Sequence, residues 1–96
     1  MQRLLLAEDD ETMRNFLSKS LRKAGYEVVT VSNGIEAIPH LSSEKFDLLL
    51  TDIVMPGMDG IELARQATNM HHELPVMFIT GFAAVAMDRN QERPKN

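Results

Sequence analysis

The spacing of hydrophobic residues changes repeatedly along the chain, from short continuous runs to recurrences every three or four positions. Short runs are typical of strands, and the longer spacing is typical of one face of an amphipathic helix. The runs are Arg3 to Ala7, Glu27 to Val31, Asp47 to Thr51 and Val76 to Thr80. The helical stretches between them are Met13 to Ala24, Ile35 to Leu41 and Ile61 to Ala67. Because the runs at 4–7 and 48–50 are apolar at every position, we predict an α/β domain whose parallel sheet is covered by helices on both faces.

Residues that favour helix ends mark the boundaries of these helices. Gly25 is suited to end the first helix, because glycine readily adopts the backbone conformation that follows a helix. Asn33 is suited to cap the second helix, and Asp59 with Glu62 three residues on resembles a capping box for the third. Pro39 falls inside the second helix and removes one of its backbone hydrogen bonds, so we predict a kink or an early end there.

Composition and charge narrow the class of protein. The chain has 96 residues, of which 44% are hydrophobic, and this is enough for one small domain. Its 10 basic and 14 acidic residues give a net charge of −4, and no basic stripe or helix-turn-helix pattern is present, which argues against a nucleic-acid partner. The chain lacks cysteine and any apolar stretch of membrane-spanning length. We therefore expect a soluble cytoplasmic protein with no membrane partner.

Acidic residues follow two of the predicted strands directly. The run at 4–7 leads into Glu8, Asp9 and Asp10, and the run at 47–51 leads into Asp52. In a parallel sheet the carboxyl ends of the strands share one edge, where ligands bind, so these acids should face one crevice. Several carboxylates in one crevice repel one another unless a hard cation such as Mg²⁺ binds among them. With Mg²⁺ in place, Asp52 is a candidate phosphoryl acceptor.

Three sequence strings in order resemble the receiver domain of two-component response regulators, the CheY-like family. They are LLLAEDD at 4–10, LLLTDIVMPGMDG at 48–60 and VMFITG at 76–81, and the likeness extends from the first residue to about Ala86. The resemblance implies a flavodoxin-like, doubly wound parallel sheet with the strand order 2-1-3-4-5. It also implies a phosphorelay in which a histidine kinase or a histidine phosphotransfer protein donates the phosphoryl group.

The resemblance assigns roles to the acidic residues. Asp52 is the residue that would be phosphorylated, and it would also be a ligand of the metal. Glu8 and Asp9 would be the acidic pair that binds Mg²⁺. Asp10 follows that pair and is the less favoured ligand, although three consecutive acids leave the register open by one. The backbone carbonyl of Val54 would complete the protein ligands.

The resemblance also assigns a switch residue, and it shows that a lysine typical of the family is missing. Thr80 would be the hydroxyl that turns toward the phosphoryl group, although a threonine at a strand exit can simply bond its own backbone. Family members carry a lysine at the end of a fifth strand, and no residue here takes that place. Lys95 follows a proline and lies on no apolar run.

The end of the chain lacks the pattern of a complete receiver. Nothing after Met87 is apolar enough to form a fifth strand and last helix, so we predict an incomplete receiver domain over residues 1–87 and a disordered polar tail over 88–96. Strand four would then be an edge strand, and self-association through that edge is an expectation of this reading.

The output of the domain has several readings. The strings TDIVMPGMDGIELARQAT (51–68) and FITGFAA (78–84) resemble single-domain receivers of the CpdR type. This resemblance implies an adaptor role for an ATP-dependent protease. The alternative is a phosphorylation-independent interaction module with the same fold, which the missing lysine favours. A haloacid-type phosphohydrolase is disfavoured, because it needs a second acid where Val54 stands.

His71 and His72 are adjacent in a polar segment, and we read them as an exposed loop rather than a metal site.

Overall fold

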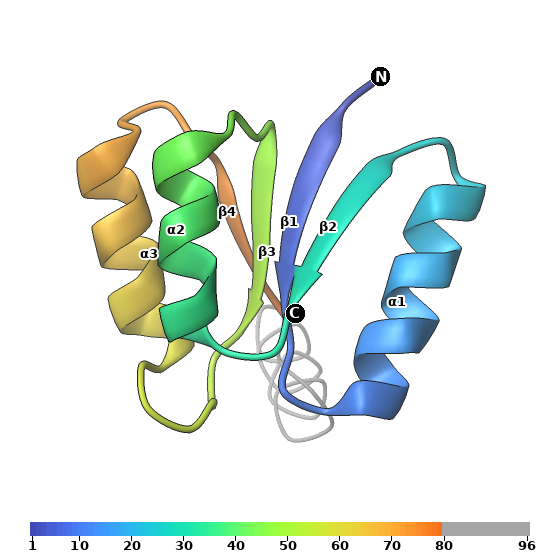
Figure 1. The fold of residues 1–96 in the computed structure, drawn as a ribbon, viewed down its shortest axis with the longest axis horizontal. Helices are drawn as coiled ribbons and strands as arrows, with labels where there is room; N and C mark the ends of the chain where they lie inside the picture. The colour runs from blue at the N-terminus through green and yellow to red at the C-terminus, as the bar shows by residue number, and fades with distance from the viewer. Residues whose placement is uncertain (80–96) are drawn as a thin grey trace, which may run out of the picture.

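The computed structural model of the protein describes residues 1–79, in which strands and helices alternate (Figure 1). In chain order the elements are β1 Arg3–Ala7, α1 Glu11–Lys23, β2 Glu27–Val31, α2 Gly34–Ser43, β3 Leu48–Asp52, α3 Gly60–Met70 and β4 Val76–Ile79. The strands form one parallel sheet in the order β2-β1-β3-β4, which confirms the predicted fold class and strand order. Thr80, Lys95 and the predicted tail at 88–96 lie outside the described residues.

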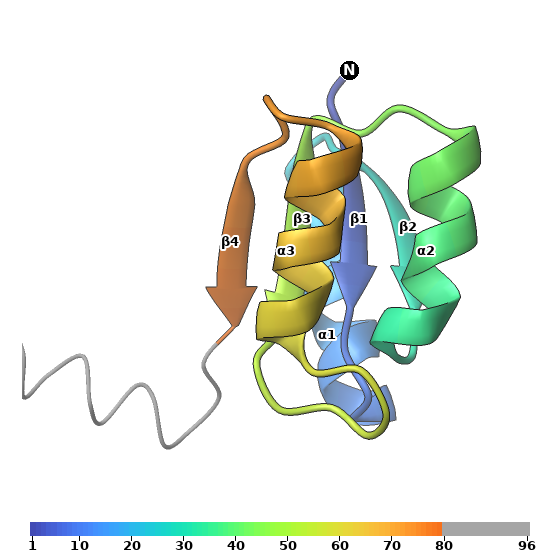
Figure 2. The same cartoon turned by 90° about the vertical axis from the view of Figure 1, so that its left-hand side faces the viewer.

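Helices cover both faces of the sheet, with α2 and α3 on one side and α1 on the other (Figures 1 and 2). Alternate residues of each strand point to opposite faces, which divides the core in two. The core under α2 and α3 contains Leu5, Ala7, Val31, Ala37, Leu41, Leu49, Met55, Leu63 and Ala67. The core under α1 contains Leu6, Val28 and Leu50, with Leu17, Leu21 and Ile79 packed against it. Helices therefore cover the purely apolar runs of β1 and β3 on both faces, as a parallel sheet requires.

Gly25 and Asn33 lie at the helix ends that the sequence indicates, while the cap of α1 by Asp10 was not predicted. The Asp10 side chain caps α1 by accepting a hydrogen bond of 2.9 Å from the Met13 backbone N–H. Gly25 follows the C-cap of α1 with φ of 104°, a conformation that residues with a side chain rarely adopt. Asn33 caps α2 by accepting from the Glu36 N–H at 2.8 Å. The caps thereby satisfy backbone donors that a helix leaves open.

The predicted capping box of α3 is only half formed. The Asp59 side chain accepts a hydrogen bond of 2.8 Å from the Glu62 N–H, so Asp59 is the N-cap as expected. The Glu62 carboxylate does not return to the Asp59 backbone and instead accepts from Arg65 and Gln66 further along the helix. The Arg65 and Gln66 side chains therefore replace the Asp59 N–H as hydrogen-bond donors to Glu62.

Of the kink or early end predicted at Pro39, the early end is wrong, because α2 continues through the proline to Ser43, and the kink stays a prediction. Proline lacks the N–H that would bond the carbonyl four residues earlier, which belongs to Ile35. Ile35 is 60% exposed, so the missing bond lies on the solvent side of the helix. Leu41, beyond the proline, is fully buried and keeps the last turn of α2 on the sheet.

Strand β3 is shifted by one residue from its predicted range of 47–51. Asp47 precedes the strand, and its carboxylate accepts a hydrogen bond of 2.8 Å from the Arg3 backbone N–H. Asp52 is the last residue of the strand, in register with Ile79 of β4.

Among the described residues β4 pairs only with β3 and is an edge strand, while the predicted self-association through it stays a prediction. None of the helices within residues 1–79 is long and apolar enough to cross a membrane.

Candidate functional site

Three carboxylates meet at the carboxyl ends of β1 and β3. Glu8 and Asp9 follow the last residue of β1, and Asp52 ends β3, the strand next to it in the sheet. One oxygen from each of the three side chains lies within 4.8 Å of the others. The parallel register produces this meeting, because it places Ala7 of β1 beside Thr51 of β3, immediately before the acids. We call these residues the acid pocket.

Hydrogen bonds to the backbone orient two of the three carboxylates. Glu8 Oε2 accepts a bond of 3.0 Å from the Asp10 N–H, and Asp52 Oδ1 accepts a bond of 2.9 Å from the Ile53 N–H. Asp10 itself is occupied in capping α1 and is not one of the three grouped acids. The geometry therefore brings together Glu8, Asp9 and Asp52, the residues to which the resemblance assigned the metal, and leaves Asp10 outside.

The acid pocket is electrostatically unfavourable without a cation. Glu8 is only 3% exposed, Asp52 is half-buried, and Asp9 is exposed to solvent. Burial, together with the neighbouring charges of Asp52 and Asp9, raises the pKa of Glu8 to about 7, against a smaller opposing effect of the Asp10 N–H. Burial also raises the pKa of Asp52, and the charge of Asp9 adds to this effect. The pocket therefore favours protonation of a carboxyl, or a bound cation in its place.

The loop from β3 to α3 packs closely against Asp52. The Gly60 N–H donates a 2.7 Å hydrogen bond to the Ile53 carbonyl, which brings the start of α3 against the end of β3. A Cβ atom on Gly60 would overlap the Asp52 carbonyl oxygen and lie 2.8 Å from the Asp52 carbonyl carbon. This close approach was not predicted. The one signal of it in the sequence is that a glycine directly follows the N-cap aspartate.

A second contact at the pocket was also not predicted. Arg14, in the first turns of α1, reaches back and donates a hydrogen bond of 2.9 Å from Nη1 to the backbone carbonyl of Glu8. From the sequence it is one of several basic residues on a polar helix face, and only the turn between β1 and α1 reveals its partner. Of the remaining predicted site residues, Val54 has an exposed side chain and Thr80 lies outside the described residues. Their roles stay predictions.

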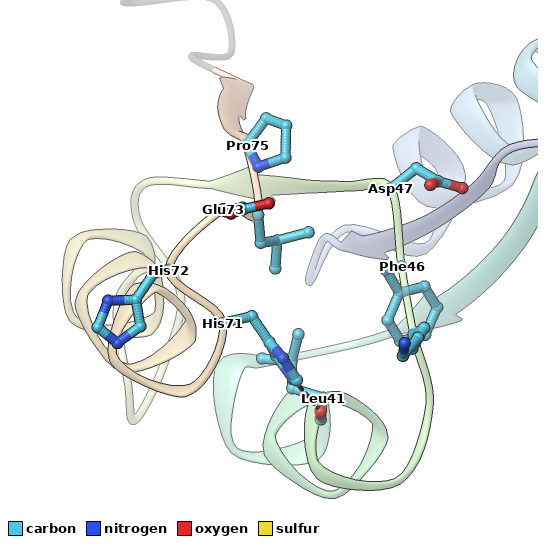
Figure 3. A pocket seen from close by; sticks show the side chains of 9 residues that line it. Leu41, Phe46, Asp47, His71, His72, Glu73 and Pro75 are labelled. Atoms are coloured by element: carbon cyan, nitrogen blue, oxygen red, sulfur yellow. Dashed lines mark hydrogen bonds between the residues drawn. The ribbon is translucent and has the colours of Figure 1, made fainter.

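A groove of about 490 Å³ lies at the other end of the sheet (Figure 3). Its lining includes Asp47 and Pro75, which precede β3 and β4, so it opens at the amino ends of the strands. His71 and His72 are exposed there as expected, but His71 is also the C-cap of α3, and its ring Nε2 lies 2.7 Å from the Leu41 carbonyl oxygen. Because Asp47 and His71 already have backbone partners, this groove offers less chemistry than the acid pocket.

Comparison with known proteins identifies the family of the chain. A family model described as the response regulator receiver domain matches residues 4–91. The chain belongs to this family. The receiver protein CpdR of Brucella abortus (strain 2308) is 58% identical over 96 residues, which are all of this chain and 80% of that protein. The sequence-based identification of a receiver domain similar to CpdR is confirmed.

Solved receiver structures agree with the fold. The response regulator TrrA of Thermotoga maritima, in complex with Mg²⁺-BeF, is 32% identical with a TM-score of 0.83, and the match covers 92% of this chain and 76% of TrrA. TrrA in complex with the histidine kinase ThkA gives a TM-score of 0.80 at 33% identity. That match covers 85% of this chain and 71% of the solved chain. This receiver domain is therefore a phosphoacceptor of two-component signalling, a signalling component rather than a conventional enzyme.

Proposed function

We propose that Asp52 is the residue of this receiver domain that accepts the phosphoryl group, and that the domain thereby controls protein binding. The observation that supports this most directly is the meeting of Asp52 with Glu8 and Asp9 within 4.8 Å at the carboxyl ends of two adjacent strands. Asp52 is half-buried, with Oδ1 bonded to the Ile53 N–H, and its second oxygen, Oδ2, takes no part in that bond. That second oxygen is the proposed nucleophile.

We propose Mg²⁺ as the cofactor, bound by Glu8, Asp9 and Asp52 with the carbonyl of Val54. The donor set is all oxygen, which suits a hard cation, and Glu8 is buried among like charges that a cation would compensate. When bound, Mg²⁺ supplies positive charge against the carboxylates and the incoming phosphoryl group. We leave Asp10 out of the proposed set, because its side chain caps α1.

The proposed transfer forms one bond and breaks one bond. The second carboxylate oxygen of Asp52 attacks the phosphorus of a phosphohistidine, the phosphorus–nitrogen bond breaks, and the electron pair returns to the imidazole of the donor. The product is an acyl phosphate on Asp52, which adds about −1.5 to −2 of charge and three acceptor oxygens. With small phosphodonors the same oxygen supports slow self-catalysed phosphorylation, and water supports slow hydrolysis.

We propose a histidine kinase or histidine phosphotransfer protein as the donor, in line with the family and with the complex of TrrA and ThkA. Thr80, by resemblance, is the hydroxyl that responds to the new charge. The likeness to CpdR supports a finer proposal, that phosphorylation controls an adaptor function toward an ATP-dependent protease. Binding of such a protease by the phosphorylated and unphosphorylated chain tests this separately from the chemistry.

The chemistry is tested by incubating the full chain with Mg²⁺ and a small-molecule phosphodonor, followed by intact mass measurement. We expect the addition of one phosphoryl group that depends on Mg²⁺ and is lost in alkali, as an acyl phosphate is. Borohydride trapping and peptide mapping should locate the group at Asp52. A chain that stays unlabelled while a known receiver is labelled in parallel would favour the phosphorylation-independent interaction module, and a label on Asp9 or Asp59 would contradict the assignment.

Magnesium binding should depend on pH near neutrality. Glu8 has a pKa of about 7 in the metal-free protein and must lose its proton before its carboxylate can bind a cation. We therefore expect the apparent Mg²⁺ affinity to fall about tenfold between about pH 8 and pH 6, with protons released on binding. Calorimetry in buffers of different ionisation enthalpy measures both quantities. An affinity that is constant over this range would show that Glu8 is not a ligand.

A further inference from the structure

Arg14 connects α1 to the turn that carries two members of the acid pocket. Its Nη1 donates a hydrogen bond of 2.9 Å to the Glu8 carbonyl, and its backbone N–H donates a bond of 2.8 Å to the Asp10 carbonyl. The side chain is half-buried, although a guanidinium at this position of a helix is usually free to extend into water. Arg14 thus bonds the backbone on either side of Asp9.

The Glu8 carbonyl belongs to the peptide unit that leads directly into Asp9. The Glu8 N–H is bonded to the Val31 carbonyl at 3.1 Å, and the Glu8 side chain is bonded to the Asp10 N–H at 3.0 Å. The bond from Arg14 fixes the remaining polar group of Glu8, so the direction in which the chain enters Asp9 is determined. Asp9 is exposed, and its approach to Asp52 depends on this backbone.

From these contacts we infer that Arg14 is a positioning residue of the acid pocket, which fixes the Glu8–Asp9 peptide so that both carboxylates face Asp52 and a common cation. The inference rests on the proposed function, in which that cation supports phosphorylation of Asp52. Arg14 does not touch the reacting atoms. It acts through the backbone, in the way that residues around a metal site orient the ligands that bind it.

A simpler reading is that Arg14 only fastens α1 to the sheet, and the chain offers a matched control for it. Arg22 lies on the same helix and donates a hydrogen bond of 2.9 Å from Nη2 to the backbone carbonyl of Val28 in β2. Val28 is in register with Leu4, at the start of β1 and far along the strand from Glu8. Arg22 therefore makes the same kind of bond at the end of the sheet opposite the acid pocket.

The experiment compares Arg14→Met, Arg14→Lys and Arg22→Met in the full chain. The readouts are the melting temperature without metal, the Mg²⁺ dissociation constant and the rate of Asp52 labelling by a small-molecule phosphodonor. We expect comparable falls in melting temperature for the two methionine variants, because each loses one charged hydrogen bond to a strand carbonyl. Only Arg14→Met should weaken Mg²⁺ binding, by about tenfold or more, and slow labelling in proportion. Arg14→Lys should restore part of both, since an ammonium can still reach the carbonyl.

The outcomes separate this inference from the proposed function. Equal Mg²⁺ affinity and labelling in Arg14→Met and Arg22→Met would overturn the positioning role. Were Arg14→Met too unstable to study, Arg14→Lys alone would decide, because a purely structural role predicts unchanged Mg²⁺ affinity for it. A wild-type chain that neither binds Mg²⁺ nor becomes labelled would overturn the proposed function itself, and the role of Arg14 with it.

Discussion

Asp52→Asn is expected to abolish phosphorylation while it stabilises the metal-free protein. An amide oxygen cannot form the acyl phosphate, so labelling should be lost completely. The stability gain has an electrostatic cause. Burial and the charge of Asp9 raise the pKa of Asp52, so its ionised form is less favourable in the folded protein than in the unfolded chain. The neutral amide removes one of three crowded charges without changing the shape of the side chain.

The sign of this effect depends on pH. The folded state binds the Asp52 proton more tightly than the unfolded state, so the ionised group lowers the free energy of unfolding above both pKa values. The advantage of Asp52→Asn should therefore be full above the folded-state pKa of Asp52 and disappear in acid, where wild-type Asp52 is protonated. Thermal unfolding without metal should show a rise of several degrees, because ~1 kcal/mol corresponds to about 4–8 °C in a domain of this size.

Asp47→Asn is the matched control for this variant. Asp47 lies at the opposite end of β3, where its carboxylate accepts a hydrogen bond from the Arg3 N–H that an asparagine oxygen can also accept. The Asp47→Asn variant should be labelled like the wild type and gain no stability at neutral pH. Added Mg²⁺ should raise the melting temperature of the wild type more than that of Asp52→Asn. A lower melting temperature of metal-free Asp52→Asn, or labelling equal to the wild type, would contradict the assignment of Asp52.

Much of the fold follows from the sequence because its physical signals are local. The strands at Arg3–Ala7 and Glu27–Val31 have the predicted bounds, since apolar runs end at polar or turn residues on both sides. The bounds of β3 were wrong by one residue, because Asp47 and Asp52 flank the run symmetrically and composition does not distinguish them. The register with β4, which pairs Asp52 with Ile79, decides the question.

The meeting of the acids was predictable, but their different surroundings were not. Parallel strands bring their carboxyl ends to one edge, so Glu8 and Asp9 had to lie near Asp52. Three consecutive acids give no indication of which one is buried. Burial depends on the loop between β1 and α1, in which Glu8 is buried and Asp10 caps α1. Arg14 was missed for the same reason, because its bond to the Glu8 carbonyl depends on how α1 leaves the sheet.

Gly60→Ala is expected to destabilise the domain severely, although alanine favours helices. Gly60 is the first residue of α3, where a Cβ atom would lie 2.8 Å from the Asp52 carbonyl carbon and 2.9 Å from Ile53 Cα. These neighbours are backbone atoms and cannot turn aside as a flexible side chain can. Alanine would gain about 1 kcal/mol in helix propensity, but forcing α3 away from β3 should cost more than this, with a net loss of about 3 kcal/mol.

Urea and thermal unfolding of Gly60→Ala measure this loss, and Gly25→Ala provides the control. At Gly25 φ is +104° and nothing lies within 4 Å of an added Cβ, so alanine should cost only about 1 kcal/mol of backbone strain. Gly60→Ala should therefore melt about 10 °C or more below the wild type, and clearly below Gly25→Ala. At a temperature where both variants are folded, labelling of Asp52 should be slower in Gly60→Ala, because the displaced backbone belongs to the acceptor residue itself. Equal stability and equal labelling of the two variants would show that the contact between α3 and Asp52 relaxes freely.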